Sequence, residues 1–67
     1  MKKFKVVIPY WDTGVRKKFD VEFIVESNNQ TEAIETAIKM FNKYEGSTFA
    51  TWIREMFEKE ITIEEVQ

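Results

Sequence analysis

The residue types that most often perform catalysis are scarce in this chain. Its 67 residues include no histidine and no cysteine, so it lacks the side chains of nucleophilic triads, of thiol chemistry and of most zinc sites. Carboxylate chemistry remains. Asp20 and Glu22 lie two positions apart in an alternating stretch, which puts both on one face of a strand. Such a pair is more typical of the solvated face of an antiparallel sheet, so we expect no catalytic residues and no enzyme.

Motifs for metals and cofactors are also missing. The acidic stretch at 58–65 does not follow the spacing of a calcium-binding loop. Residues 46–48 resemble the end of a phosphate-binding loop but lack its lysine and its upstream glycine. We therefore expect no metal ligand, no cofactor-binding residue and no bound cofactor.

The strongest candidate for a binding site is the first hairpin, whose turn is flanked by aromatic and basic residues: Tyr10, Trp11, Arg16, Lys17 and Lys18. Trp, Tyr and Arg are enriched at the hot spots of protein interfaces, so we interpret these residues as a docking site for a partner protein. Aromatic rings beside basic groups also suit nucleic acid, which is the alternative. A structural role stays open too, with Tyr10 closing the core and the basic groups preventing aggregation of an edge strand.

The distribution of charge favours a protein partner over nucleic acid. Residues 1–18 hold six basic side chains and one acidic, whereas residues 19–67 hold four basic and eleven acidic, for an overall charge of −2. The acidic majority would repel phosphate unless it faces away from the hairpin. A small acidic protein can also act as an inhibitor that imitates DNA. We expect a non-enzymatic protein-interaction module, and a small regulator or inhibitor is one form that it can take.

The elements that position the hairpin residues follow from the alternation of apolar and polar side chains. Residues 3–11 and 16–26 alternate with a period of two, which predicts two strands. The turn residues at 12–14 join them into a hairpin, with Gly14 suited to a positive φ. Pro9 has no backbone N–H, which places the first strand at an edge of the sheet or at a bulge.

A helix follows the second strand. Asn29 is the preferred N-cap and Thr31 the alternative. Apolar residues at helical spacing continue the helix to about residue 45, and Gly46 is suited to end it. The apolar faces of strand and helix are expected to bury each other, the strand contributing Phe19, Val21, Phe23 and Val25 and the helix Ile34, Ile38 and Phe41.

The last third of the chain predicts a second helix and a third strand. Residues 47–59 repeat the helical spacing, with Trp52 and Phe57 on the core side. Residues 60–64 alternate again and predict a strand, which frays at Glu65. The fold class is α+β: strand–strand–helix–helix–strand, with both helices on one face of a three-stranded antiparallel sheet. We favour the order 1-2-3, and 2-1-3 is the alternative.

The other face of this sheet is expected to stay uncovered. It would carry Val7, Trp11 and Ile24, and exposed apolar residues of this kind often mark an interface. A homodimer, through this face or through the edge formed by the first or third strand, also stays open. The length predicts a single domain spanning 1–67.

The sequence also predicts a location. The lysines at 2 and 3 resemble the start of a signal peptide, but the apolar run at 6–8 is far shorter than the roughly 7–15 residues that such a peptide needs. No stretch approaches the roughly 18 apolar residues of a membrane span. With no cysteine for disulfides, we expect a cytoplasmic protein without membrane contact.

Overall fold

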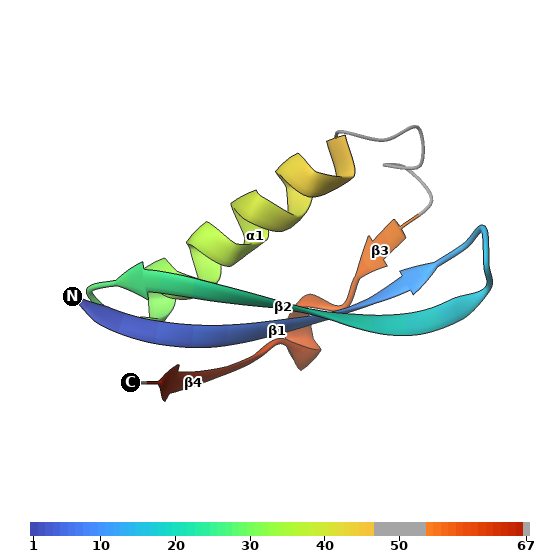
Figure 1. Cartoon of the computed structure of the whole chain (residues 1–67). Helices are drawn as coiled ribbons and strands as arrows, with labels where there is room; N and C mark the ends of the chain where they lie inside the picture. Colours follow the sequence, from blue (N-terminus) through green and yellow to red (C-terminus); the bar gives the residue numbers. More distant parts are fainter. Residues whose placement is uncertain (47–53, 67) are drawn as a thin grey trace.

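The structure is a computed structural model that describes residues 1–46 and 54–66. Two long strands form a hairpin, one helix follows, and the chain then returns along the sheet (Figure 1). The elements are β1 (Lys2–Asp12), β2 (Lys17–Ser27), α1 (Gln30–Gly46), β3 (Arg54–Met56), the 3₁₀ turn η2 (Glu58–Glu60) and β4 (Thr62–Val66). The protein is thus a small α+β fold in which one described helix packs on an antiparallel sheet of four strands.

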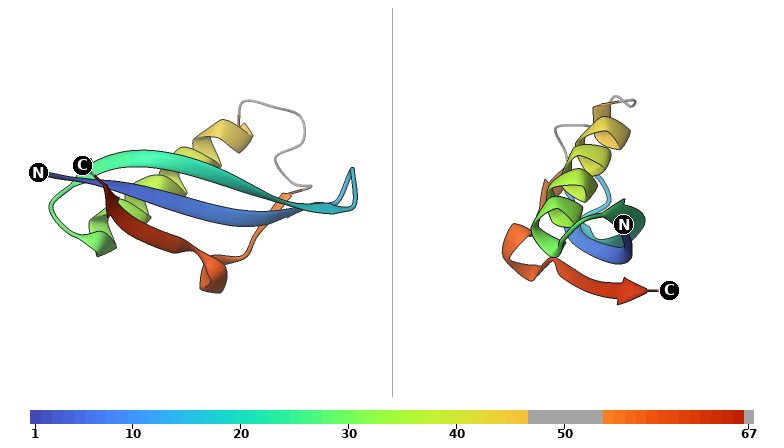
Figure 2. Two further views of the ribbon diagram at one scale, coloured as in Figure 1. Left: turned by 60° about the horizontal axis from the view of Figure 1, so that its bottom comes forward. Right: turned by 90° about the vertical axis from the view of Figure 1, so that its left-hand side faces the viewer.

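The sheet is organised around β1. This strand pairs with β2 on one side and with both β3 and β4, end to end, on the other, and every pairing is antiparallel. Figure 2 (left) shows β1 between β2 and β4, with α1 behind them. The favoured order, with the second strand in the centre, is therefore wrong, and the alternative with the first strand in the centre is correct.

Pro9 shows why a central position is tolerated. The C=O of Pro9 accepts a hydrogen bond of 2.9 Å from the N–H of Phe57. Because the N–H and C=O of one strand residue point to the same side, the missing N–H of Pro9 lies on this side as well. Here residues 57–61 interrupt the edge, since β3 pairs with 10–12 and β4 with 3–7. The missing N–H of Pro9 therefore faces the break between β3 and β4. The hydrogen-bond ladder is interrupted there, so β1 can contain a proline without lying at an edge of the sheet.

The helix begins where the sequence predicts. The Oδ1 of Asn29 accepts a hydrogen bond of 2.9 Å from the N–H of Glu32, and the C=O of Asn29 accepts one of 3.1 Å from the N–H of Ala33. These are the bonds of an N-cap, so Asn29 is the cap and Thr31 is not. The described helix extends to Gly46, after which the described residues resume at Arg54.

The layering of strand against helix is confirmed in part: Val25 and Phe41 are buried as predicted, whereas Phe19 and Ile34 are only half-buried, and β1 has a larger share of the core than expected. The buried core consists of Phe4, Val6, Ile8, Val25, Ala33, Ala37 and Phe41. Val21, Phe23 and Ile38 are only half-buried at its margin. The central strand contributes the largest fully buried side chains, Phe4, Val6 and Ile8, because it has a neighbouring strand on both sides, whereas β2 lies at the edge.

The predicted second helix is not found where the chain is described. Residues 47–53 of that prediction, including Trp52, lie outside the described residues. Residues 54–56 form a strand, and 58–60 form a single 3₁₀ turn. An extended chain places Met56 against the core and Phe57 on the opposite side, and β3 supplies a ladder partner for the end of β1. The pairing of β3 with β1 thus outweighs the helical spacing of the apolar side chains in this segment. The last strand begins later than predicted, and it continues to Val66 instead of fraying at Glu65.

Candidate protein-binding face

The sheet has one face that α1 does not cover, here called the open face. It is formed by the odd-numbered residues of β1 and the even-numbered residues of β2, because side chains alternate along each strand. Trp11 on β1 is 36% exposed and Ile24 on β2 is 55% exposed, while Val7 is half-buried. These are the three residues that the sequence placed on the uncovered face. Phe57 and Glu60, from the segment around η2, contact Lys18 on this face.

Trp11 is flanked on the open face by charged residues from both neighbouring strands. Its register partners are Lys18 on β2 and Glu55 on β3. The Nζ of Lys18 extends across the sheet to η2, where it lies 2.8 Å from a carboxylate oxygen of Glu60 and 5.0 Å from the centroid of the Phe57 ring. Trp11 is thus an exposed aromatic side chain beside a contact network formed by the Lys18 ammonium group, the Glu60 carboxylate and the Phe57 ring.

Tyr10 and Lys17 point to the opposite face, where α1 packs. The Tyr10 ring stacks on Phe19 with centroids 5.8 Å apart and contacts Phe41 at 5.5 Å. The guanidinium of Arg54 lies 5.4 Å from the Tyr10 centroid, and the Nζ of Lys17 lies 5.8 Å from the Phe19 centroid. Tyr10 therefore anchors the hairpin to the helix, as its structural interpretation predicts. Four of the five predicted hairpin residues divide between two faces, with Trp11 and Lys18 on the open one, and the fifth, Arg16, lies in the turn.

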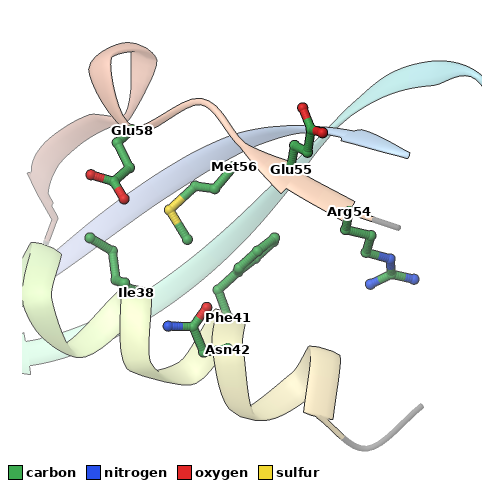
Figure 3. A pocket seen from close by; sticks show the side chains of 7 residues that line it. All are labelled: Ile38, Phe41, Asn42, Arg54, Glu55, Met56 and Glu58. Atoms are coloured by element: carbon green, nitrogen blue, oxygen red, sulfur yellow. The ribbon is translucent and has the colours of Figure 1, made fainter. Parts of the chain in front are cut away.

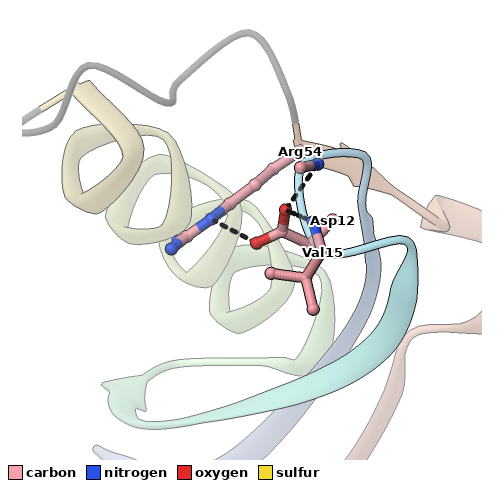
Figure 4. Close-up of polar contacts among 4 residues, drawn as sticks. Asp12, Val15 and Arg54 are labelled. Carbon is pink, nitrogen blue, oxygen red and sulfur yellow. Dashed lines mark hydrogen bonds and ion pairs between the residues drawn. The ribbon is translucent and has the colours of Figure 1, made fainter.

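The hairpin turn is held by Asp12. Its Oδ1 accepts hydrogen bonds from the N–H groups of Gly14 (2.9 Å) and Val15 (3.1 Å), and its C=O accepts one from the N–H of Arg16 at 2.7 Å. Its Oδ2 lies 3.9 Å from the Nε of Arg54, and both side chains are less than one fifth exposed (Figure 4). Arg16, at the exposed tip, has a φ of 60°, whereas no glycine among the described residues has a positive φ. Gly14, which is suited to a positive φ, does not adopt one, and the left-handed residue of the turn is Arg16.

The opposite charges of the two ends of the chain meet across the sheet. Lysines of β1 and β2 lie close to glutamates of β4 and η2: Lys2 with Glu65 at 3.8 Å, Lys5 with Glu64 at 3.0 Å, and Lys18 with Glu60 at 2.8 Å. The hydrogen bond and charge of Glu64, helped by the charge of Glu22, raise the pKa of Lys5 above its usual 10.5. The basic side chains of β1 and β2 thus pair with the acidic C-terminal region of the same chain. This pairing partly neutralises the charge asymmetry that the sequence shows.

A groove of about 520 Å³ lies between α1 and the chain from β3 to η2 (Figure 3). It is lined by Ile38, Phe41, Asn42, Arg54, Glu55, Met56 and Glu58. These side chains include a cation, two carboxylates and an amide. Among the described residues, no cluster of three or more potential ligands could hold a metal ion, and no helix in the same ranges has the length and hydropathy to cross a membrane.

Two features of this region were not predicted from the sequence. Phe57 and Glu60 reach the open face because η2 interrupts the edge, and Arg54 reaches Asp12 because β3 pairs with the end of β1. Adjacent apolar residues at 56 and 57, which face opposite sides of an extended chain, are the one local signal of this arrangement. The ion pair and the cation–ring contact join residues about forty positions apart, so no spacing within the sequence indicates them.

The fold and the site define the class of protein: a small α+β domain whose sheet is open on one face. Comparison of the chain with models of known protein families, with curated proteins and with solved structures gave no match. Its function must therefore be argued from its own residues.

Proposed function

We propose that this protein is a non-enzymatic interaction module, a small regulator or inhibitor, that docks on a partner protein through the open face. Trp11 is the proposed anchor, and Arg16 and Lys18 lie at its rim. The observation that carries the proposal is the exposure of Trp11 on a face that no described helix covers. The cytoplasmic location expected from the cysteine-free sequence remains part of this proposal.

The chemistry around Trp11 supports this proposal. Tryptophan is among the residues that contribute most to protein interfaces, and such anchors work best when surrounding polar groups exclude water. Lys18 is already oriented by Glu60 and Phe57, so little side-chain freedom would be lost when a partner covers it. Tyr10 and Lys17 no longer belong to the proposed site, because both lie on the helix side of the sheet.

Nucleic-acid binding through the same hairpin is the second candidate. It has the support of Trp11 with Lys3, Lys5 and Lys18 on one face. Two of these lysines already have acidic partners, Glu64 and Glu60, which reduces the positive potential that phosphate would meet. This pairing is our reason for ranking a protein partner first.

The test uses two double variants of the tagged protein. Trp11→Ala with Arg16→Ala removes the anchor and the exposed tip, and Met40→Ala with Lys43→Ala is a control that alters an equally exposed surface of α1. We expect proteins captured from the native lysate by the wild type to be lost from the first variant and retained by the control. Both variants should melt within a few degrees of the wild type.

Two outcomes would contradict the proposal. If the first variant unfolds, Trp11 is a core residue and the open face is not a docking site. If wild type and first variant retain the same proteins, the partner, if any, binds elsewhere. Titration with labelled single- and double-stranded DNA and RNA at two salt concentrations tests the second candidate: binding that weakens steeply with salt supports it, and no binding at low salt eliminates it.

A further inference from the structure

Besides the open face, the edge of the sheet formed by β2 is a candidate binding surface. Within the described residues, β2 pairs with β1 alone. It is a strand of 11 residues without proline, and its register with β1 is continuous from Lys2↔Ser27 to Asp12↔Lys17. The opposite edge is interrupted by η2. Of the two edges, β2 is therefore the regular one, and a regular strand edge can accept a further strand.

The direction of the backbone groups on β2 follows from that of Pro9. Its C=O points toward Phe57, so odd-numbered residues of β1 direct their N–H and C=O toward β3 and β4, and even-numbered ones toward β2. In the β1–β2 register, each even-numbered residue of β1 pairs with an odd-numbered residue of β2, as Val6 does with Phe23. The even-numbered residues of β2 consequently direct their N–H and C=O outward: Lys18, Asp20, Glu22, Ile24 and Glu26.

The side chains along this edge specify the chemistry of an incoming strand. On the helix side, Phe19, Val21 and Phe23 are half-buried, so they can cover further apolar side chains. On the open face, Asp20, Glu22 and Glu26 are exposed and acidic. None of the three takes part in the ion pairs found among the described residues, which join Lys2–Glu65, Lys5–Glu64, Lys18–Glu60 and Asp12–Arg54.

We propose that the β2 edge binds an extended segment of another protein in which lysine or arginine alternates with apolar residues. The segment would add a strand to the sheet, with its basic side chains beside Asp20, Glu22 and Glu26 and its apolar side chains beside Phe19 and Phe23. A second copy of this chain is a poorer occupant. Antiparallel pairing about Glu22 would place Glu22 opposite its own copy and Asp20 opposite Ile24, so neither carboxylate would meet a basic side chain, and only Lys18 would face an acidic one, Glu26. The carboxylates of this edge lie on the open face, but strand addition uses the outward backbone groups of β2 and does not require Trp11, so either proposal can fail without the other.

The test measures binding of a fluorescent peptide as long as β2 in which lysine alternates with valine and threonine. Two control peptides have glutamate in place of lysine, or the same composition in scrambled order. The wild type should bind the alternating lysine peptide at least about tenfold more tightly than either control, since strand addition needs alternation as well as charge. Equal binding of the scrambled peptide would overturn the proposal, because charge alone would explain it.

Two variants at one position separate the backbone from the charge. Glu22→Thr removes the carboxylate and keeps the outward N–H, whereas Glu22→Pro removes both but none of the bonds to β1. We expect Glu22→Thr to weaken binding a few-fold and Glu22→Pro to abolish it, with circular dichroism showing that both are folded. Equal binding by the two variants would overturn the proposal.

A charge reversal and an exchange measurement keep the proposal testable if Glu22→Pro does not fold. The double variant Asp20→Lys with Glu22→Lys should prefer the glutamate peptide over the lysine peptide. In the wild type, bound peptide should slow amide hydrogen exchange at the even positions 18–26, while the odd positions, already bonded to β1, change little. Uniform protection, or no binding by any peptide, would overturn the proposal. So would a wild-type dimer in light scattering that Glu22→Pro dissociates, because a second copy would then occupy the edge.

Discussion

At the scale of single residues, Asp12 joins two parts of the fold that are distant in sequence. One carboxylate oxygen receives the N–H groups of Gly14 and Val15, and the other lies near the Nε of Arg54 on β3. The first contact fixes the hairpin turn, and the second attaches the short strand β3 to the end of β1. A carboxylate at this position therefore supports the loop from which the rim residue Arg16 projects.

Replacing Asp12 should separate these two contributions. Asp12→Ala leaves two turn N–H groups without their acceptor and removes the carboxylate that lies 3.9 Å from the Nε of Arg54, so we expect a loss of about 2–3 kcal/mol in the free energy of unfolding. Asp12→Asn keeps an oxygen acceptor for the turn and should lose about 1 kcal/mol. Urea unfolding followed by circular dichroism measures both, with the exposed Asp20→Ala as a control expected within about 0.5 kcal/mol of wild type. Equal losses for the two Asp12 variants would show that the turn bonds contribute little.

At the scale of elements, α1 and β3 differ in what determines their conformation. α1 has its own start signal in Asn29 and its own apolar face in Ala33, Ala37 and Phe41. β3, by contrast, is three residues long, and its extended form depends on β1 as a neighbour. The helix could accordingly be placed from local sequence, whereas β3 could not.

The start signal of α1 can be tested by itself. Asn29→Ala removes the acceptor of the Glu32 N–H, and such N-cap losses cost about 1 kcal/mol. Asn28→Ala alters the preceding exposed asparagine and should change the free energy of unfolding by less than about 0.5 kcal/mol. Chemical denaturation of the two variants side by side checks this. A similar loss for both would mean that the whole loop, and no single cap, sets the start of the helix.

At the scale of the whole molecule, a small core holds the described helix on the sheet, and ion pairs join the strands and η2 to one another. Exposed pairs such as Lys5–Glu64 are screened by solvent and contribute little to stability, so the core must provide the main stabilisation. A single core of this size rarely supplies more than about 3–5 kcal/mol of net stability. Phe41 is central to it, since its ring is buried from α1 against Tyr10 of β1.

Truncation of Phe41 should therefore unfold the protein. Phe41→Ala costs about 3–5 kcal/mol in a buried site, which is comparable to the whole net stability, whereas Phe41→Leu should cost roughly 1 kcal/mol. The neighbouring exposed Met40→Ala is the matched control. Amide NMR spectra should be collapsed for Phe41→Ala and dispersed for the other two. A dispersed spectrum for Phe41→Ala would show that the core is more stable than its size suggests.

The sequence by itself determined those features that depend on neighbouring residues: the alternation of both hairpin strands, the cap at Asn29, the helical face of α1 and the uncovered position of Trp11 and Ile24. Each arises from side-chain periodicity or from a bond between residues a few positions apart. For the same reason the residues of the predicted hairpin site do not share one face, because alternation separates Tyr10 from Trp11 onto opposite faces of the sheet.

The tertiary structure alone decided the order of the strands and the fate of residues 54–60. The position of Pro9 in the central strand became possible only because residues 57–61 interrupt the neighbouring edge, some fifty positions later in the chain. The same pairing brought Arg54 to Asp12 and Glu60 to Lys18. Backbone ladders and ion pairs of this kind are satisfied between distant segments, so they are settled when the whole chain packs and not by any local pattern.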